Sequence, residues 1–92
     1  MTISETIGWF NSIFDLNKRN GQNAKSDFCC VMTDDVEQYK KAHHVEMLGI
    51  TECSDWDIAK KVMRLMQNEG YHVIPFDSEK EMLPVYVCLY KK

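Results

Sequence analysis

A strand–helix–strand unit in the middle of the chain constrains the fold more than any other feature of the sequence. Residues 28–32, FCCVM, form a short apolar run that is typical of a buried strand, and a second run occupies residues 45–53. The charged segment 33–43 lies between these runs and opens with Thr33, a residue that favours the N-cap position. We therefore predict a helix with Thr33 as its N-cap between two strands, and Glu46 indicates that one face of the second strand is wet.

The segments on both sides of this unit complete the pattern. Residues 2–16 carry apolar side chains at helical spacing, and residues 55–69 do the same up to Gly70, a residue type that commonly follows a helix. Residues 72–76 and 85–90 have the pattern of strands, and the alternation within 85–90 suits an antiparallel strand. The predicted order is α-β-α-β-α-β-β. This order predicts an α+β two-layer sandwich, in which a small, mostly antiparallel sheet of three or four strands packs against helices.

Length and charge narrow the class of protein. A chain of 92 residues makes a single domain, residues 1–92. Fourteen acidic against eleven basic residues give a net charge of −3, which disfavours a general nucleic-acid binder and favours a protein or small-molecule partner. The N-terminus lacks the basic and apolar regions of a secretory signal, and no run of apolar residues is long enough to span a membrane. We expect a soluble, cytoplasmic protein that does not act at a membrane.

The four cysteines are expected to be reduced and to pack as small apolar residues. They are Cys29, Cys30, Cys53 and Cys88, and no two of them have the C-x2-C spacing of a structural zinc site. The adjacent pair Cys29 and Cys30 falls in a predicted strand, so the two side chains should point to opposite faces of the sheet. The sequence therefore predicts no metal and no cofactor.

The segment 31–43, VMTDDVEQYKKAH, resembles the middle of small GIY-YIG nuclease-like domains. In those domains an apolar strand ends in threonine, a helix opens with acidic or amide residues, and the segment closes on a histidine. The positions that match in type and spacing are Thr33, Asp34, Val36, Glu37 and His43. The resemblance covers residues 28–90 and implies that family's fold, with nucleic acid as a ligand.

The chain departs from that family at the residues that carry its chemistry. The family places an arginine on this helix to stabilise phosphate charge, and the matching positions here are Gln38 and Tyr39. Its two N-terminal tyrosines are replaced by a predicted helix with Trp9 and Phe10, and its metal-binding glutamate by the stretch KVMR at residues 61–64. Phosphodiester hydrolysis needs a metal carboxylate and a cation over the transition state. The resemblance therefore implies the scaffold and not an active nuclease.

The candidate interaction surface comes from the central helix and the last strand. The helix dipole favours basic residues near the end of the helix and acidic residues at its start. We therefore interpret the two aspartates as residues that stabilise the start of the helix, in preference to a cation site. The tyrosines of the last strand would offer aromatic contacts to a partner if that strand lies at a sheet edge, and covering by the N-terminal helix is the alternative. The surface consists of Asp34, Asp35, Tyr39, Lys40, Lys41, His43, Tyr86 and Tyr90.

Three hypotheses about function follow. The first is a small, non-catalytic binding or regulatory module that acts through a macromolecular partner. The second is a divergent GIY-YIG-like scaffold that binds nucleic acid, which requires a metal cluster and the convergence of Lys18, Arg19, Lys25, Lys40 and Lys41. The third is a ferredoxin-like, self-associating sensor that binds a small ligand at a dimer interface and shares a sheet edge or face between two chains.

Overall fold

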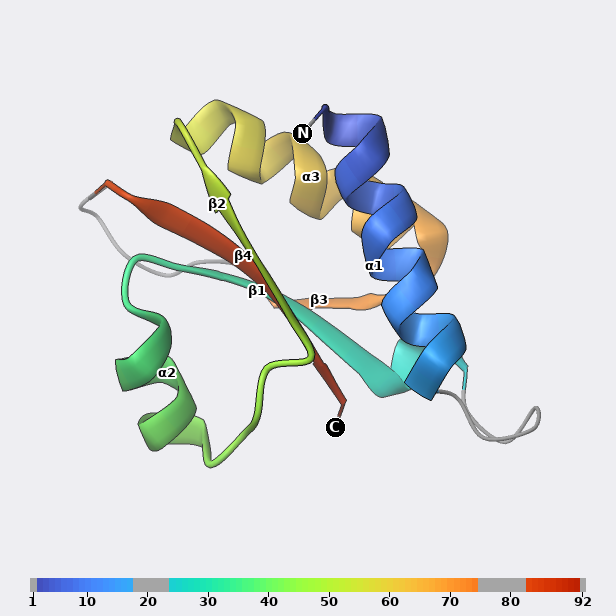
Figure 1. Ribbon diagram of the computed structural model, residues 1–92, viewed down its shortest axis with the longest axis horizontal. Coiled ribbons are helices and arrows are strands. Elements are labelled where there is room, and N and C mark those ends of the chain that lie inside the picture. Colours follow the sequence, from blue (N-terminus) through green and yellow to red (C-terminus); the bar gives the residue numbers. More distant parts are fainter. Residues whose placement is uncertain (1, 18–23, 75–82, 92) are drawn as a thin grey trace.

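The structure, a computed structural model, describes residues 2–17, 24–74 and 83–91. Three α-helices and four strands appear in these ranges, together with one short 3-10 turn at Lys25–Asp27, and their order is the predicted one (Figure 1). The elements are α1 (Ile3–Asn17), β1 (Phe28–Thr33), α2 (Val36–His43), β2 (Gly49–Cys53), α3 (Trp56–Glu69), β3 (His72–Ile74) and β4 (Val85–Lys91). Of the expected third strand, residues 75 and 76 lie outside the described residues.

The four strands form one mixed sheet in the order β2-β4-β1-β3. The strand β4 pairs antiparallel with both β1 and β2, whereas β1 pairs parallel with β3. Two of the three strand pairs are thus antiparallel, and the predicted α+β class with a small, mostly antiparallel sheet is confirmed. The last strand, β4, lies in the middle of the sheet, and the two edges are β2 and β3, so the condition for an aromatic surface at a sheet edge is not met.

Helices cover both faces of the sheet, whereas the predicted two-layer sandwich has helices on one face only. The helices α1 and α3 lie on one side of the sheet and α2 on the other (Figure 1). The connection through α2 carries the chain from β1 past β4 to β2, and the connection through α3 carries it back to β3. Crossovers between parallel strands are right-handed, and these two run in opposite directions along the sheet. Their helices must therefore lie on opposite faces.

The face under α1 and α3 holds the larger core. Sixteen buried residues contact one another there, among them Phe10 from α1, Met66 from α3 and Leu89 from β4. Polar contacts join the two helices at the rim of this core, where Asn11 Nδ2 donates to Glu69 Oε1 at 2.7 Å. At β2, a Cβ added to Gly49 would lie 2.5 Å from Ile13 Cδ1, so glycine permits the close approach of α1 to this strand.

The face under α2 holds a smaller cluster. Its four buried residues come from the two central strands, and α2 and its flanking loop add half-buried side chains. The buried residues are Cys29, Val31, Cys88 and Tyr90. As predicted, Cys29 and Cys30 point to opposite faces, since Cys30 belongs to the larger core. All four cysteines are buried and free of disulfides.

Two local boundaries differ from the prediction. The N-cap of α2 is Asp35, whose Oδ1 accepts a hydrogen bond from Gln38 N at 3.0 Å. Thr33 is still paired within β1, and its hydroxyl accepts from Asp35 N at 3.1 Å, which shapes the turn before the helix. The strand β2 begins at Gly49, because residues 45–48 connect α2 to the sheet rather than pair as a strand. By contrast, Gly70 ends α3 in the left-handed conformation, with φ of 106°, as predicted.

Candidate functional site

The structure separates the eight residues of the predicted interaction surface into three groups. The first is the tyrosine pair Tyr39 and Tyr90, which is part of the core under α2. Tyr90 is only 6% exposed, its hydroxyl lies 3.1 Å from that of Tyr39, and burial together with this hydrogen bond raises its pKa. Because β4 is central and α2 covers this face, the pair stabilises the fold and is not a free aromatic surface, and α1 lies on the opposite face.

The second group lies along the solvent side of α2. Lys40 Nζ lies 3.6 Å from Glu37 Oε1, and Lys41 is exposed. The ring of His43 stacks on that of Tyr39 with a centroid distance of 4.1 Å, and His44 follows as the left-handed C-cap of the helix. Lys40, Lys41 and His43 all lie in the last turn of α2, where the helix dipole favours basic side chains.

The third group meets at the sheet. Asp34, Asp35 and Tyr86 line a hollow of about 390 Å³, together with Val36, Glu37 and Ile50. We call this hollow the α2 pocket. Its floor is apolar and its rim is acidic. Glu52 adds a further carboxylate to the same face of the sheet, because it pairs with Tyr86 across β2 and β4.

The requirements of the nuclease hypothesis are not met by the described residues. Lys25 lies within 3.8 Å of Glu69 and over the rings of Phe14 and Tyr71, on the α1–α3 face. Lys40 lies on α2, which covers the opposite face, so these two lysines do not converge. Lys18 and Arg19 lie outside the described residues. Among residues 2–17, 24–74 and 83–91, no group of three or more histidine, cysteine or acidic side chains is arranged to hold a metal ion.

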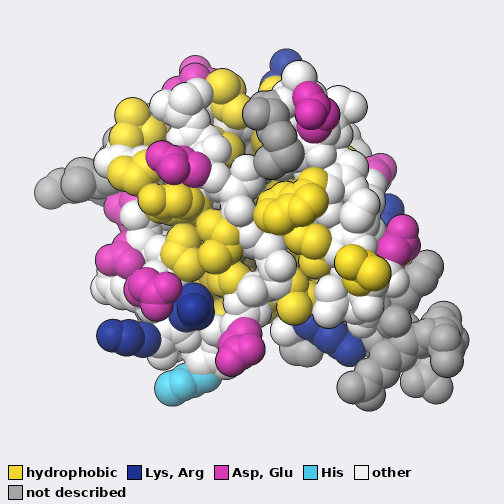
Figure 2. Space-filling model, viewed as in Figure 1, with side chains coloured by type: hydrophobic (Ala, Val, Ile, Leu, Met, Phe, Trp, Pro, Cys, Tyr) yellow, Lys and Arg dark blue, Asp and Glu magenta, His cyan; other side chains and the backbone are white. Residues whose placement is uncertain are grey.

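The predicted interaction surface does not include the free edge of β2. This strand pairs only with β4 among the described strands, so its outer backbone groups have no strand partner there. Exposed apolar side chains flank it, since Ile50 is 43% and Leu48 37% exposed. Figure 2 shows apolar side chains gathered over the β2 side of the sheet and over α1. Such an edge is a template for pairing with another chain.

Trp9 belongs to the same surface. It lies one helical turn from both Thr6 and Ile13, and Ile13 contacts β2 at Gly49. Trp9 is 37% exposed, although its ring also lies 5.2 Å from that of Phe10. The free edge is therefore bordered by α1 on one face and by the α2 pocket on the other. We call Trp9, Leu48 and residues 49–53 the β2-edge surface.

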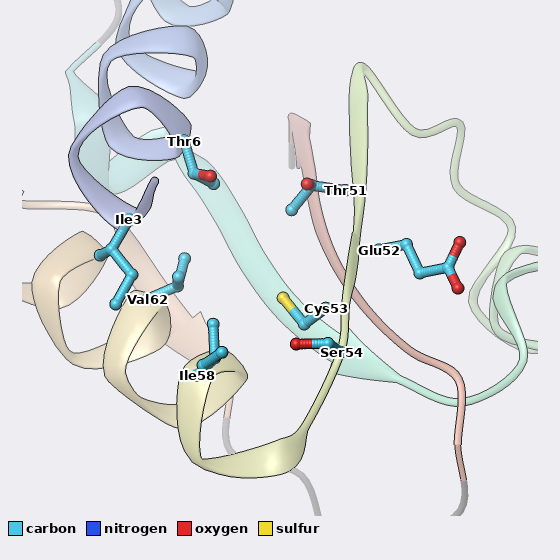
Figure 3. A pocket seen from close by; sticks show the side chains of 8 residues that line it. All are labelled: Ile3, Thr6, Thr51, Glu52, Cys53, Ser54, Ile58 and Val62. Atoms are coloured by element: carbon cyan, nitrogen blue, oxygen red, sulfur yellow. The ribbon is translucent and has the colours of Figure 1, made fainter. Parts of the chain in front are cut away.

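A cavity of about 350 Å³ opens beside β2 on the α1–α3 face (Figure 3). Thr51 and Cys53 point into it from the strand, Ser54 from the turn before α3, and Ile58 and Val62 from α3 itself, whereas Glu52 points away (Figure 3). The N-terminal turn of α1 closes it with Ile3 and Thr6. We call this space the α1–α3 cavity. Its size lies at the lower end of the range for ligand pockets.

The thiol that lines the α1–α3 cavity, from Cys53, is not activated. Burial, and secondarily Asp55 and Glu52, raise the pKa of the Cys53 thiol, so it is a poor nucleophile. The Thr6 hydroxyl already donates to the Thr2 carbonyl oxygen at 3.0 Å. No buried side-chain nitrogen or oxygen in the described part of the chain lacks a hydrogen-bond partner.

The sequence carried only part of the signal for this surface. The alternation of Ile50 and Glu52 with Thr51 and Cys53 could have indicated two differently lined faces. Which strand would lie at the edge depends on the crossover through α2, and no local pattern encodes that choice.

No helix of the described residues is both long and apolar enough to cross a membrane. In comparisons with known proteins, no family model matches the chain. No curated protein and no solved structure matches it either. The resemblance to GIY-YIG domains thus has no support from these comparisons.

Proposed function

We propose that this protein is a small, non-catalytic binding module, and that it acts by pairing the free edge of β2 with an extended segment of a protein partner. The observation that carries the proposal is the β2-edge surface itself: an unpaired strand edge with exposed apolar side chains and a hollow on each face. In strand addition, backbone hydrogen bonds supply affinity, and pockets for alternate side chains supply specificity.

A different protein is a better partner than a second copy of this chain. Two copies that joined their β2 edges around a twofold axis would bring two acidic rims to one interface, each with Asp34, Asp35 and Glu52 near the strand. Like charges brought together at an interface cost on the order of several kcal/mol of binding free energy. A partner with basic residues avoids this repulsion.

Selection from a randomised library of displayed decapeptides, followed by amide chemical-shift mapping of the selected peptides, tests the proposal. We expect the selected peptides to shift the amides of Gly49–Cys53 and Leu48 first. The variant Ile50→Lys should abolish binding, because it replaces an exposed apolar side chain at the edge with a charged one. Leu16→Lys is the matched control, since Leu16 is 84% exposed and lines neither hollow.

Shifts that map to the outer side of α2 or α3 instead of β2, or equal binding by the Ile50→Lys variant, would contradict strand addition. Sedimentation of the chain alone checks for self-pairing. A dimer that Ile50→Lys dissociates would assign the same edge to a second copy and overturn the choice of a different partner.

A further inference from the structure

The two hollows beside β2 lie on opposite faces of the sheet. Thr51 and Cys53 line the α1–α3 cavity, whereas the neighbouring Ile50 lines the α2 pocket. Successive side chains of a strand point to opposite faces, and an added strand lies about 4.8 Å from β2 with the same alternation. A partner strand on this edge would therefore direct one residue toward the α1–α3 cavity and the next toward the α2 pocket.

The α1–α3 cavity offers room and aliphatic contacts for a large apolar side chain. The aliphatic groups of Ile3, Ile58 and Val62 line it, and the charged group of Glu52 points away from it (Figure 3). Of the hydroxyl groups that line it, that of Thr6 already donates to the Thr2 carbonyl oxygen at 3.0 Å. A charged side chain would lose its hydration there without gaining a counter-charge.

The α2 pocket selects a lysine or arginine. Three carboxylates line its rim, from Asp34, Asp35 and Glu37, and the apolar floor includes Tyr86 and Ile50. One carboxylate oxygen of Asp35 caps α2, and the carboxylate of Glu37 forms an ion pair with Lys40. The negative charge of the three carboxylates therefore exceeds the positive charge that Lys40 supplies. Long basic side chains lay an aliphatic stem on apolar surface and keep the charged end at an acidic rim.

From these two lining sets we infer that the partner segment is an extended strand in which a large apolar residue, bound in the α1–α3 cavity, alternates with a lysine or arginine, bound in the α2 pocket. The inference rests on the proposed strand addition at β2 and adds the chemistry of the partner. The two residues are adjacent or differ in sequence position by another odd number, because they face opposite sides of the sheet.

Titration of the ¹⁵N-labelled chain with four synthetic nonapeptides tests the pattern. The reference peptide alternates threonine and serine and carries an adjacent leucine and lysine at its centre. The second replaces the leucine by alanine, the third replaces the lysine by glutamate, and the fourth is the reference peptide with alternate backbone amides N-methylated. We expect the reference peptide to shift Gly49–Cys53, and each of the other three to bind about tenfold more weakly or worse.

Two chain variants assign each preference to its hollow. Ser54→Phe fills the α1–α3 cavity and should remove the preference for leucine over alanine, whereas Ser12→Phe, on exposed α1 surface, should leave it unchanged. The double variant Asp34→Asn and Glu37→Gln leaves the Asp35 cap intact and should remove the preference for lysine over glutamate.

The outcomes separate the inference from the function on which it rests. If N-methylation abolishes binding but the leucine and lysine replacements have no effect, the side-chain pattern is overturned and strand addition stands. If N-methylation has no effect, or no peptide shifts β2, strand addition fails and the inference fails with it.

Discussion

The two faces of the sheet differ in how they are covered. The face under α1 and α3 buries sixteen residues, including Phe10 and Trp56, in one apolar cluster. The face under α2 buries four, and its contacts include a hydrogen bond between two tyrosine hydroxyls. A helix of eight residues, Val36–His43, cannot cover what α1 and α3 cover together. The thicker face supplies most of the stability, and the thinner face leaves an acidic, partly apolar hollow beside β2.

A rise in pH should lower the free energy of unfolding more than any of the substitutions below. It tests whether both faces of the sheet keep their buried thiols away from solvent. Burial raises the pKa of Cys88, on the α2 face, to about 12, and also raises that of Cys30, on the α1–α3 face. Both thiols stay protonated in the folded protein but ionise in the unfolded chain above about pH 8.5, so stability falls as the pH rises. We expect each thiol to contribute a loss of about 1.4 kcal/mol per pH unit between about pH 9 and 11.

Urea unfolding under reducing conditions at several pH values measures this slope. Cys30→Ala and Cys88→Ala should each flatten it by the same amount. A slope that Cys30→Ala flattens and Cys88→Ala does not would show that the α2 face opens on its own and lets Cys88 ionise in the folded state.

A matched pair of valine substitutions should give a smaller effect and compares the faces directly. Val87 and Val31 lie in the central strands with 0% and 1% exposure, the first on the α1–α3 face and the second on the α2 face. A valine-to-alanine substitution removes two buried methyl groups, which costs about 1.5 kcal/mol in transfer free energy. The cavity left behind adds to this cost. We expect Val87→Ala to cost about 1 kcal/mol more than Val31→Ala, because α2 can move inward more readily than the two-helix layer.

The free energy of unfolding from urea titration checks this difference. Equal costs at the two positions would mean that α2 holds its face as rigidly as α1 and α3 hold theirs.

The smallest effect is expected at the tyrosine pair. Tyr90→Phe removes the hydrogen bond between the hydroxyls of Tyr39 and Tyr90, 3.1 Å apart, and should cost about 1 kcal/mol. Tyr39→Phe should cost a similar amount. A double-mutant cycle should give a combined loss smaller than the sum, because both single changes remove the same bond. Additive losses would show that the two hydroxyls act independently of each other.

The local elements could be predicted from the sequence because their signals are local. The spacing of Phe10 and Phe14 identified α1. The glycine at position 70 identified the end of α3, and in the structure it has the left-handed conformation. Where several cap residues compete, the prediction erred by two positions: Thr33 has the right side chain, but it is held in β1, and Asp35 caps the helix. Of the predicted surface, Asp34, Asp35 and Tyr86 meet at the α2 pocket, whereas Tyr39 and Tyr90 are core.

The sequence by itself determined the identity and order of the elements, the buried state of the cysteines, and the acidic start of α2, since each depends on neighbouring residues alone. The order of strands in the sheet was decided only by the tertiary structure. With β4 placed between β1 and β2, Tyr90 became buried under α2 and β2 became an edge. Two opposite right-handed crossovers then put α2 and α3 on different faces, which created one hollow on each side of that edge. Contacts between residues far apart in the chain make this choice, and no short pattern can encode it.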